Sequence, residues 1–299
     1  MNTEPKPVPC EPFQPEIKLR FTVPPGACDT HIHFYGPREQ YPLQGAPHFP
    51  IPDATPAEFF ERQQAMGMAR AVVVNAAATG LDNRRTLDAL REAPTRLRGI
   101  ITPPPKVPSD SELQEWNGLG VRGVRFNYFG TPLPGMALDD TLIQRFSALG
   151  WHTQIQVSDG QIVELADRLA GLPCPLVIDH MARIPAVWGV QSKAFQSLLR
   201  LIDRGNVWVK LSAPMRYSSE DRPPYADVGI MARALVDHAP ERMLWASDWP
   251  NVNYNGVIPG YDVLLDLLFD WATDDTTRNR ILVDNPCKLY GFPPPDVLP

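Results

Sequence analysis

The sequence lacks several features that would assign it to a common class of protein. It has no run of eighteen apolar residues, so it predicts no transmembrane helix. The first 25 residues are charged and Pro-rich, without the apolar core of a secretion signal. The four cysteines are far apart and form no Cys-x-x-Cys pair, which argues against a zinc knuckle and fits a reducing cytoplasm. A formal net charge of −6 without a basic run argues against nucleic acid as a partner.

The length and composition are those of a folded α/β protein. A chain of 299 residues can form two average domains or one α/β barrel, and 43% hydrophobic residues are enough for a large core. The 34 prolines gather at the N-terminus, in one internal loop and near the C-terminus. We expect an extended Pro-rich N-terminal arm over 1–25 and a catalytic domain over 26–299.

Apolar strands alternate with amphipathic helices along the whole chain. The expected strands cover 27–33, 70–75, 97–101, 123–127, 152–156, 175–179, 207–211 and 243–247. Thr55 to Glu58 and Ser109 to Glu112 are capping boxes that open two of the helices. This alternation predicts a parallel sheet, and eight units predict a closed (β/α)8 barrel. An open doubly wound sheet is the alternative, but no Gly-x-Gly-x-x-Gly follows any expected strand.

The first expected strand ends in His31-Ile32-His33. Successive side chains of a strand alternate between faces, so both imidazoles point the same way and could bind one metal ion or one substrate oxygen. The alternative is that these are two unrelated histidines, because so short a motif also occurs by chance. The positions of other polar residues must decide between these interpretations.

Further polar residues stand where the expected strands end, which in a parallel barrel is the edge that carries the active site. They are Asn75, Arg125, Asn127, Gln156, Asp179, His180, Lys210, Ser212 and Asp248. Three of the six histidines therefore gather at one mouth, together with two aspartates. Unrelated core histidines have no reason to do so, and we predict that His31, His33, His180 and Asp248 form the functional centre.

Three stretches carry a specific resemblance: 29–33 (Asp-Thr-His-Ile-His), 177–183 (Val-Ile-Asp-His-Met-Ala-Arg) and 245–250 (Trp-Ala-Ser-Asp-Trp-Pro). They resemble signatures of the amidohydrolase superfamily, and the most similar branch contains 2-pyrone-4,6-dicarboxylate hydrolase and related lactonases. The resemblance extends from about Pro24 to Tyr290. It implies an amidohydrolase-type barrel in which Asp248 is the general base that activates water, while His31, His33 and His180 polarise the lactone carbonyl.

The same resemblance limits the metal chemistry. Binuclear members place a lysine or glutamate on strand four and a histidine on strand five, whereas this chain has Arg125 or Asn127 and Gln156 there. Arg and Gln rarely bind zinc, so a two-metal site is not expected. Two alternatives stay open. Either no metal is required, or a single Zn or Mn ion is held by His31, His33, His180 and Asp248.

The expected substrate is a small anionic lactone. Arg125, Arg183 and Arg216 correspond to family arginines that bind substrate carboxylates, and we add Asn127 and Gln156 as substrate-binding residues. No acidic partner for these arginines is evident from the sequence except Asp248; surface salt bridges are the alternative. Gln156 and Phe49 replace family tyrosines, and 129–131 lacks a further family arginine. We therefore expect the pyrone dicarboxylate itself to be a poor substrate.

The sequence thus predicts a cytoplasmic hydrolase that uses activated water to open a carboxylated or sulfonated lactone, in aromatic or sugar-acid catabolism. Lactone isomerisation and non-oxidative decarboxylation on the same barrel are the alternatives, followed by a binding protein without catalysis. The intact His-x-His pair and the complete His/Asp set favour hydrolysis. A homo-oligomer is left open.

Overall fold

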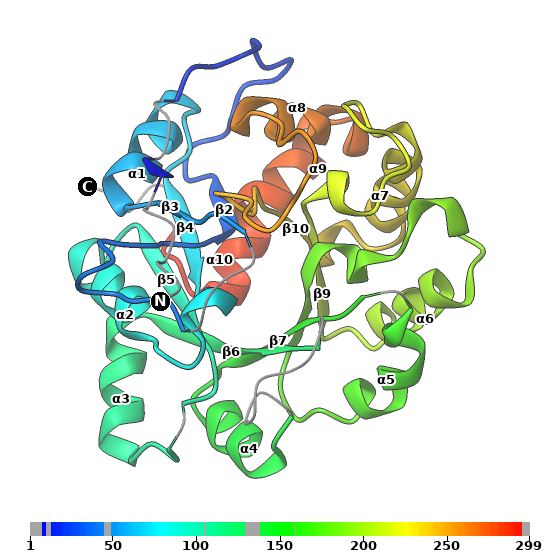
Figure 1. Cartoon of the computed structure of the whole chain (residues 1–299). Helices are drawn as coiled ribbons and strands as arrows, with labels where there is room; N and C mark the ends of the chain where they lie inside the picture. Colours follow the sequence, from blue (N-terminus) through cyan, green and yellow to red (C-terminus); the bar gives the residue numbers. More distant parts are fainter. Residues whose placement is uncertain are drawn as a thin grey trace.

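A parallel eight-stranded barrel forms the body of the protein (Figure 1). The computed structural model describes residues 8–9, 13–44, 49–104, 106–128, 138–158 and 160–294. All eight expected strands are confirmed: β2 (Cys28–Ile32), β4 (Arg70–Val74), β5 (Leu97–Ile101), β6 (Val121–Asn127), β7 (His152–Gln156), β8 (Leu176–Ile178), β9 (Val207–Leu211) and β10 (Met243–Trp245). They pair in parallel in the order β10-β9-β8-β7-β6-β5-β4-β2. A bridge between Ile32 and Trp249 brings the two end strands together.

Helices follow the strands and surround the barrel (Figure 1). They are α1 (Pro56–Ala65), α2 (Arg84–Glu92), α3 (Asp110–Leu119), α4 (Asp140–Ala148), α5 (Gln161–Ala170), α6 (Lys193–Ile202), α7 (Ala226–His238) and α8 (Tyr261–Trp271). Both predicted capping boxes are formed, because Glu58 accepts from the Thr55 N–H at 2.6 Å and Glu112 from the Ser109 N–H at 2.7 Å.

The end of the chain differs from the prediction. A single helix is expected over 276–283, whereas the structure has α9 (Asp275–Asn279), a π-helical turn η6 (Arg280–Asp284) and α10 (Asn285–Tyr290). The wider turn buries Ile281, Leu282 and Val283 together, and Pro286 fits the first turn of α10, where its missing N–H costs nothing. Four strands are also shorter than expected, since β2 ends at Ile32, β4 at Val74, β8 at Ile178 and β10 at Trp245.

Two apolar cores lie on opposite faces of the sheet. Val72 and Val74 of β4 belong to a small cluster with alternate residues of other strands, which fills the barrel interior, whereas Ala71 and Val73 pack in the larger cluster beneath the helices. Tyr290, at the end of α10, joins the interior cluster together with Phe292. The barrel interior is therefore filled by packed side chains, which include the buried polar pair Lys210 and Gln154, and the open pocket lies at its mouth.

The described part of the predicted arm lies along α8. The Asp262 carboxylate accepts hydrogen bonds from the N–H groups of Glu16 and Ile17, at 2.6 and 2.7 Å. Arg20 forms ion pairs with Asp266 and Asp270. A two-residue strand β1 (Val8–Pro9) pairs with β3 (Pro52–Asp53), while 1–7 and 10–12 lie outside the described residues. Among the described helices, none is long and apolar enough to span a bilayer.

Candidate active site

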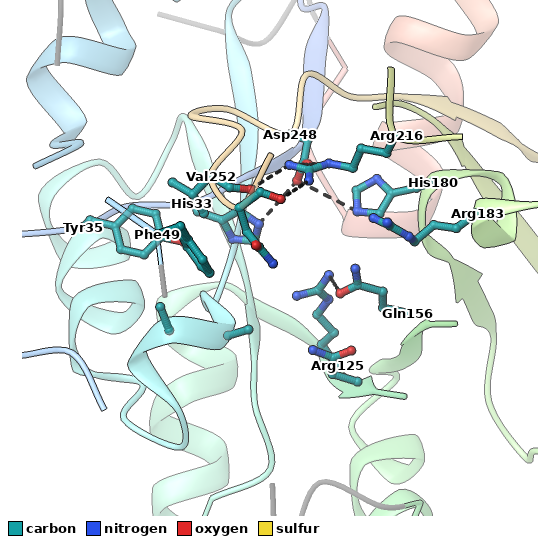
Figure 2. Close-up of a pocket in the computed structure, with 14 residues that line it drawn as sticks. His33, Tyr35, Phe49, Arg125, Gln156, His180, Arg183, Arg216, Asp248 and Val252 are labelled. Atoms are coloured by element: carbon teal, nitrogen blue, oxygen red, sulfur yellow. Dashed lines mark hydrogen bonds and ion pairs between the residues drawn. The ribbon is translucent and has the colours of Figure 1, made fainter. Parts of the chain in front are cut away.

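Three histidines converge on one aspartate at the mouth of the barrel, and Figure 2 shows two of them, His33 and His180, beside Asp248. His31 Nε2 lies 3.2 Å from His33 Nε2, so the two imidazoles of β2 do share one face. Asp248 Oδ1 is 3.5 Å from His33 Nε2, 3.7 Å from His31 Nε2 and 3.9 Å from His180 Nε2. The structure thus brings together the four residues predicted as the functional centre.

The opposite nitrogen of each imidazole is held by a fixed partner. His33 Nδ1 donates to the Val74 carbonyl at 2.8 Å, and because that oxygen can only accept, the neutral ring keeps a lone pair on Nε2. His180 Nδ1 shares a hydrogen bond of 2.8 Å with the Ser212 hydroxyl. Burial lowers the pKa of His180 to about 4, so this ring is neutral near pH 7.

Strained backbone presents two of these groups. Residues 180–183 all have positive φ, from 50° to 56°, although none is glycine. Asp248 also lies in the left-handed region, with φ 60°. Such conformations cost roughly 1–2 kcal/mol per residue and persist only where the surroundings enforce them. The turn after β8 places both His180 and Arg183 at the pocket.

Arg216 is the charged partner of Asp248. Its Nε and Nη2 atoms both lie 3.2 Å from Asp248 Oδ2, and it also donates to the carbonyls of Val252 and Asn253. Burial alone would raise the pKa of Asp248, but the charges of His180 and Arg216 hold it well below its usual value. We attribute this mainly to Arg216, which stays cationic at all pH values of interest. Asp248 is therefore a carboxylate.

A second charged layer lies beneath His31. Asp179 Oδ1 is 3.2 Å from His31 Nδ1 and 3.5 Å from the Lys210 ammonium, while Asp179 Oδ2 accepts from Arg125 Nε at 2.8 Å. Lys210 is fully buried, which lowers its pKa to about 8. The sequence argument that Asp248 is the one acidic partner near the arginines is therefore wrong, because Asp179 turns inward and pairs with Arg125.

The pocket itself has two unlike sides. Eight of the nine predicted site residues line it, and the ninth, His31, is buried behind His33. Arg125, Gln156 and Arg183 lie on one side, where Gln156 Oε1 accepts from Arg125 Nη2 at 2.5 Å. Tyr35 and Phe49 lie on the other side. Asn127 also lines the pocket, and 129–131 lies outside the described residues.

Sequence reasoning placed Asp179 and Lys210 at the strand ends but did not connect them to His31. It also missed the role of Asp29, because the sequence does not show that this residue binds Ser247 and Tyr261, which are more than 200 positions away. Tyr35, Ala77 and Ala78 of the pocket wall were missed as well, and nothing in their residue types would have identified them.

The donor set fits a single divalent ion. Zinc binds imidazole nitrogens at about 2.0–2.1 Å, which in a tetrahedral site puts donors about 3.3 Å apart. The ligand atoms of His31, His33 and Asp248 are 3.2–3.7 Å apart, and His180 Nε2 is 3.9 Å from Asp248 Oδ1. His31, Asp179 and His180 form a second group of possible metal ligands among the described residues, but there Asp179 is already paired with Lys210 and Arg125.

The fold and this centre define the class of protein, a (β/α)8-barrel enzyme. The chain belongs to the amidohydrolase family, whose sequence model matches residues 28–292. An apo crystal structure from Agrobacterium tumefaciens is similar, with a TM-score of 0.78 and 27% identity over 91% of this chain and 98% of that chain.

Three curated relatives cover almost the full length. A 4-sulfomuconolactone hydrolase from Hydrogenophaga intermedia is 37% identical over 91% of both chains. A 2-pyrone-4,6-dicarboxylate hydrolase from Comamonas testosteroni is 36% identical over 93% of both chains. A D-galactarolactone isomerase from Agrobacterium fabrum is 30% identical over 91% of this chain and 93% of the relative.

Proposed function

We propose that this chain hydrolyses the ring of an anionic lactone. The observation that carries the proposal is the convergence of three imidazoles on the ionised Asp248 at the barrel mouth. The substrate class is supported by the two relatives named as hydrolases of 4-sulfomuconolactone and 2-pyrone-4,6-dicarboxylate. Those substrates fit aromatic catabolism.

In the proposed reaction, Asp248 accepts a proton from water as the water oxygen bonds to the lactone carbonyl carbon. The carbonyl oxygen becomes an oxyanion, which fixed positive groups at this mouth can stabilise. The ring C–O bond then breaks, and the ring oxygen leaves with the proton from Asp248. The products are a carboxylic acid and a hydroxyl group, so one water is consumed for each ring.

A divalent ion would be held by His31, His33, His180 and Asp248. When bound, it supplies Lewis-acid polarisation of the carbonyl and of water. The remaining work belongs to the protein. Arg216 keeps Asp248 ionised and oriented, the Val74 carbonyl orients His33, and Asp179 orients His31.

The two sides of the pocket suggest how the substrate lies. We propose that its anionic group faces Arg183 and Arg125, because a guanidinium binds a carboxylate or sulfonate through two parallel hydrogen bonds. The carbon skeleton of the ring then packs against Tyr35 and Phe49. Gln156 lies on the same side as Arg125, and Asn127 also lines the pocket; both would contact ring oxygens.

Replacement of the base tests the proposal. Asp248→Asn keeps the shape of the side chain but cannot take up the proton, and loss of a general base costs about a hundred- to ten-thousandfold in rate. Turnover is measured on a panel of carboxylated, sulfonated and neutral lactones, with a pH indicator for the released acid. Asp270→Asn, the same change far from the site on α8, is the matched control and should retain full activity. A folded Asp248→Asn variant with more than about a tenth of wild-type turnover would contradict this role.

Lactone isomerisation is the second candidate, because the galactarolactone isomerase is also a relative. Isomerisation leaves the mass of the substrate unchanged, whereas hydrolysis adds one water. Mass spectrometry of the product from the same panel therefore separates the two reactions.

We also propose the domain division and location expected from the sequence: an arm over 1–25, a catalytic domain over 26–299 and a cytoplasmic protein. The contacts of Glu16, Ile17 and Arg20 with α8 support an arm that docks on the barrel. The free thiols of Cys28, Cys174 and Cys287 are consistent with a reducing compartment.

A further inference from the structure

The barrel closes at a seam between β2 and β10. These strands stand at the two ends of the pairing order, and the described residues form only one bridge between them, Ile32 with Trp249. Two main-chain hydrogen bonds cross the seam, from His33 N–H to the Trp249 carbonyl at 2.8 Å and from Asp248 N–H to the His31 carbonyl at 3.0 Å. The histidine pair lies on one side of the seam and Asp248 on the other, so their separation depends on how the seam is held.

One buried carboxylate spans this seam. Asp29 is fully buried, and its Oδ1 accepts from the N–H groups of His31 and Ser247, each at 3.1 Å. Its Oδ2 accepts from the Ser247 hydroxyl at 2.5 Å and from the Tyr261 hydroxyl at 3.0 Å. Asp29 therefore binds three segments at once: its own strand β2, Ser247 just before Asp248, and Tyr261 at the start of α8.

These contacts fix the backbone on both sides of Asp248. Ser247 is held to Asp29 through its N–H and its hydroxyl, and the same hydroxyl oxygen accepts from the Trp249 N–H at 3.0 Å. Asp248 lies between these anchors, and its own backbone is in the left-handed region although it is not a glycine. A left-handed backbone is disfavoured by roughly 1–2 kcal/mol, so this conformation depends on the contacts that hold its neighbours.

We propose that Asp29 is a positioning residue that keeps Asp248 in register with His31 and His33 across the barrel seam. Asp29 touches neither the pocket nor a substrate, and it acts through Ser247 and the backbone of β2. Its role in turnover rests on the proposed lactone hydrolysis, but its role in the seam does not. A charge-assisted hydrogen bond is about twice as strong as a neutral one, which suits a carboxylate with four donors to this task.

Asp29→Asn is the decisive variant. The amide oxygen can still accept from the two N–H groups, and the amide nitrogen can donate to the two hydroxyls, so the barrel should fold with a weaker seam. We expect kcat to fall about ten- to a hundredfold with KM changed less than about threefold, because the groups proposed to bind the anion are on other strands. Tyr261→Phe removes one outer donor only and should cost less than about threefold in kcat.

Asp262→Asn is the matched control. Asp262 is equally buried and also accepts two main-chain N–H groups, but those belong to the arm and not to the seam. Its replacement should lower the melting temperature without changing kcat. A similar loss of kcat in Asp262→Asn would show that general destabilisation explains both results, and would overturn the proposal.

Hydrogen exchange followed by mass spectrometry gives a readout that does not depend on catalysis. Asp29→Asn should speed exchange in peptides that contain His33 and Asp248, whose N–H groups cross the seam, while peptides from β6 and β7 stay protected. If the wild-type protein opens no lactone but this local change is seen, the proposed function fails and the role of Asp29 in the seam is supported. Unchanged seam exchange together with unchanged kcat would refute the role.

Discussion

Replacement of Arg216 by Met distinguishes two roles that the sequence cannot separate. The family resemblance predicts that Arg216 binds the substrate anion, which would make Arg216→Met raise KM. In the structure its Nε and Nη2 atoms lie 3.2 Å from Asp248 Oδ2, and the guanidinium also binds the carbonyls of Val252 and Asn253. We expect the main effect of the replacement to be on Asp248 and therefore on kcat.

The size of the effect follows from these contacts. A hydrogen bond to a charged group contributes about 1.5–3 kcal/mol, and each 1.36 kcal/mol is a factor of ten in rate. Methionine keeps the apolar bulk of the arginine but removes its donors, which leaves a buried carboxylate without its cation. We expect kcat to fall about ten- to a hundredfold if the interaction with Asp248 is lost in the transition state as well as in the free enzyme.

Steady-state kinetics on the best lactone of the panel gives kcat and KM separately. Arg183→Met is the matched control, because Arg183 lines the same pocket and is proposed to bind the anionic group of the substrate. It should raise KM about tenfold or more and leave kcat nearly unchanged. If Arg216→Met instead raises KM strongly at constant kcat, Arg216 binds the substrate and our reasoning from its contacts is wrong.

Two further predictions concern acid stability and metal content. Burial lowers the pKa of His152 in the folded protein to about 3, from about 6.5 in an unfolded chain. As the pH falls, the unfolded chain therefore takes up a proton at this residue before the folded protein does. The free energy of unfolding should drop by about 2 kcal/mol between pH 6.5 and pH 5. The free energy of unfolding of His152→Leu, measured in urea, should lack this part of the pH dependence. If that free energy changes with pH as steeply as in the wild type, His152 does not cause the dependence. Elemental analysis of protein purified without chelator should find at most one divalent ion per chain, and fewer in Asp248→Ala. Two tightly held equivalents would contradict the pairing of Asp179 with Lys210 and Arg125.

The fold could be predicted almost completely because its signals are local. All eight strands lie within two residues of their expected bounds, and both capping boxes act as their residue types imply. The C-terminal helices could not be placed, since the π-helical turn at Arg280–Asp284 depends on how three apolar residues reach the core. Local propensity carries no information about that packing.

The candidate site could be predicted as a set of residues but not as a geometry. Strand ends located His31, His180 and Asp248, because a parallel barrel brings those ends together. The sequence gives no sign that residues 180–183 would form a left-handed turn without glycine, a conformation that only tertiary contacts can impose. Nor does it show that Asp179 points down beneath His31 rather than into the pocket.

The seam between β2 and β10 also has a consequence for biosynthesis. Its hydrogen bonds join residues more than 210 positions apart, such as Thr30 with Trp245 and Asp29 with Ser247. Loops of this length are slow to close, and domains tend to fold as their segments leave the ribosome. The nascent chain can therefore complete neither its barrel nor its catalytic centre until residues 243–249 have emerged. Until then β2 and β9 present open, apolar strand edges, which are the surfaces that chaperones must shield.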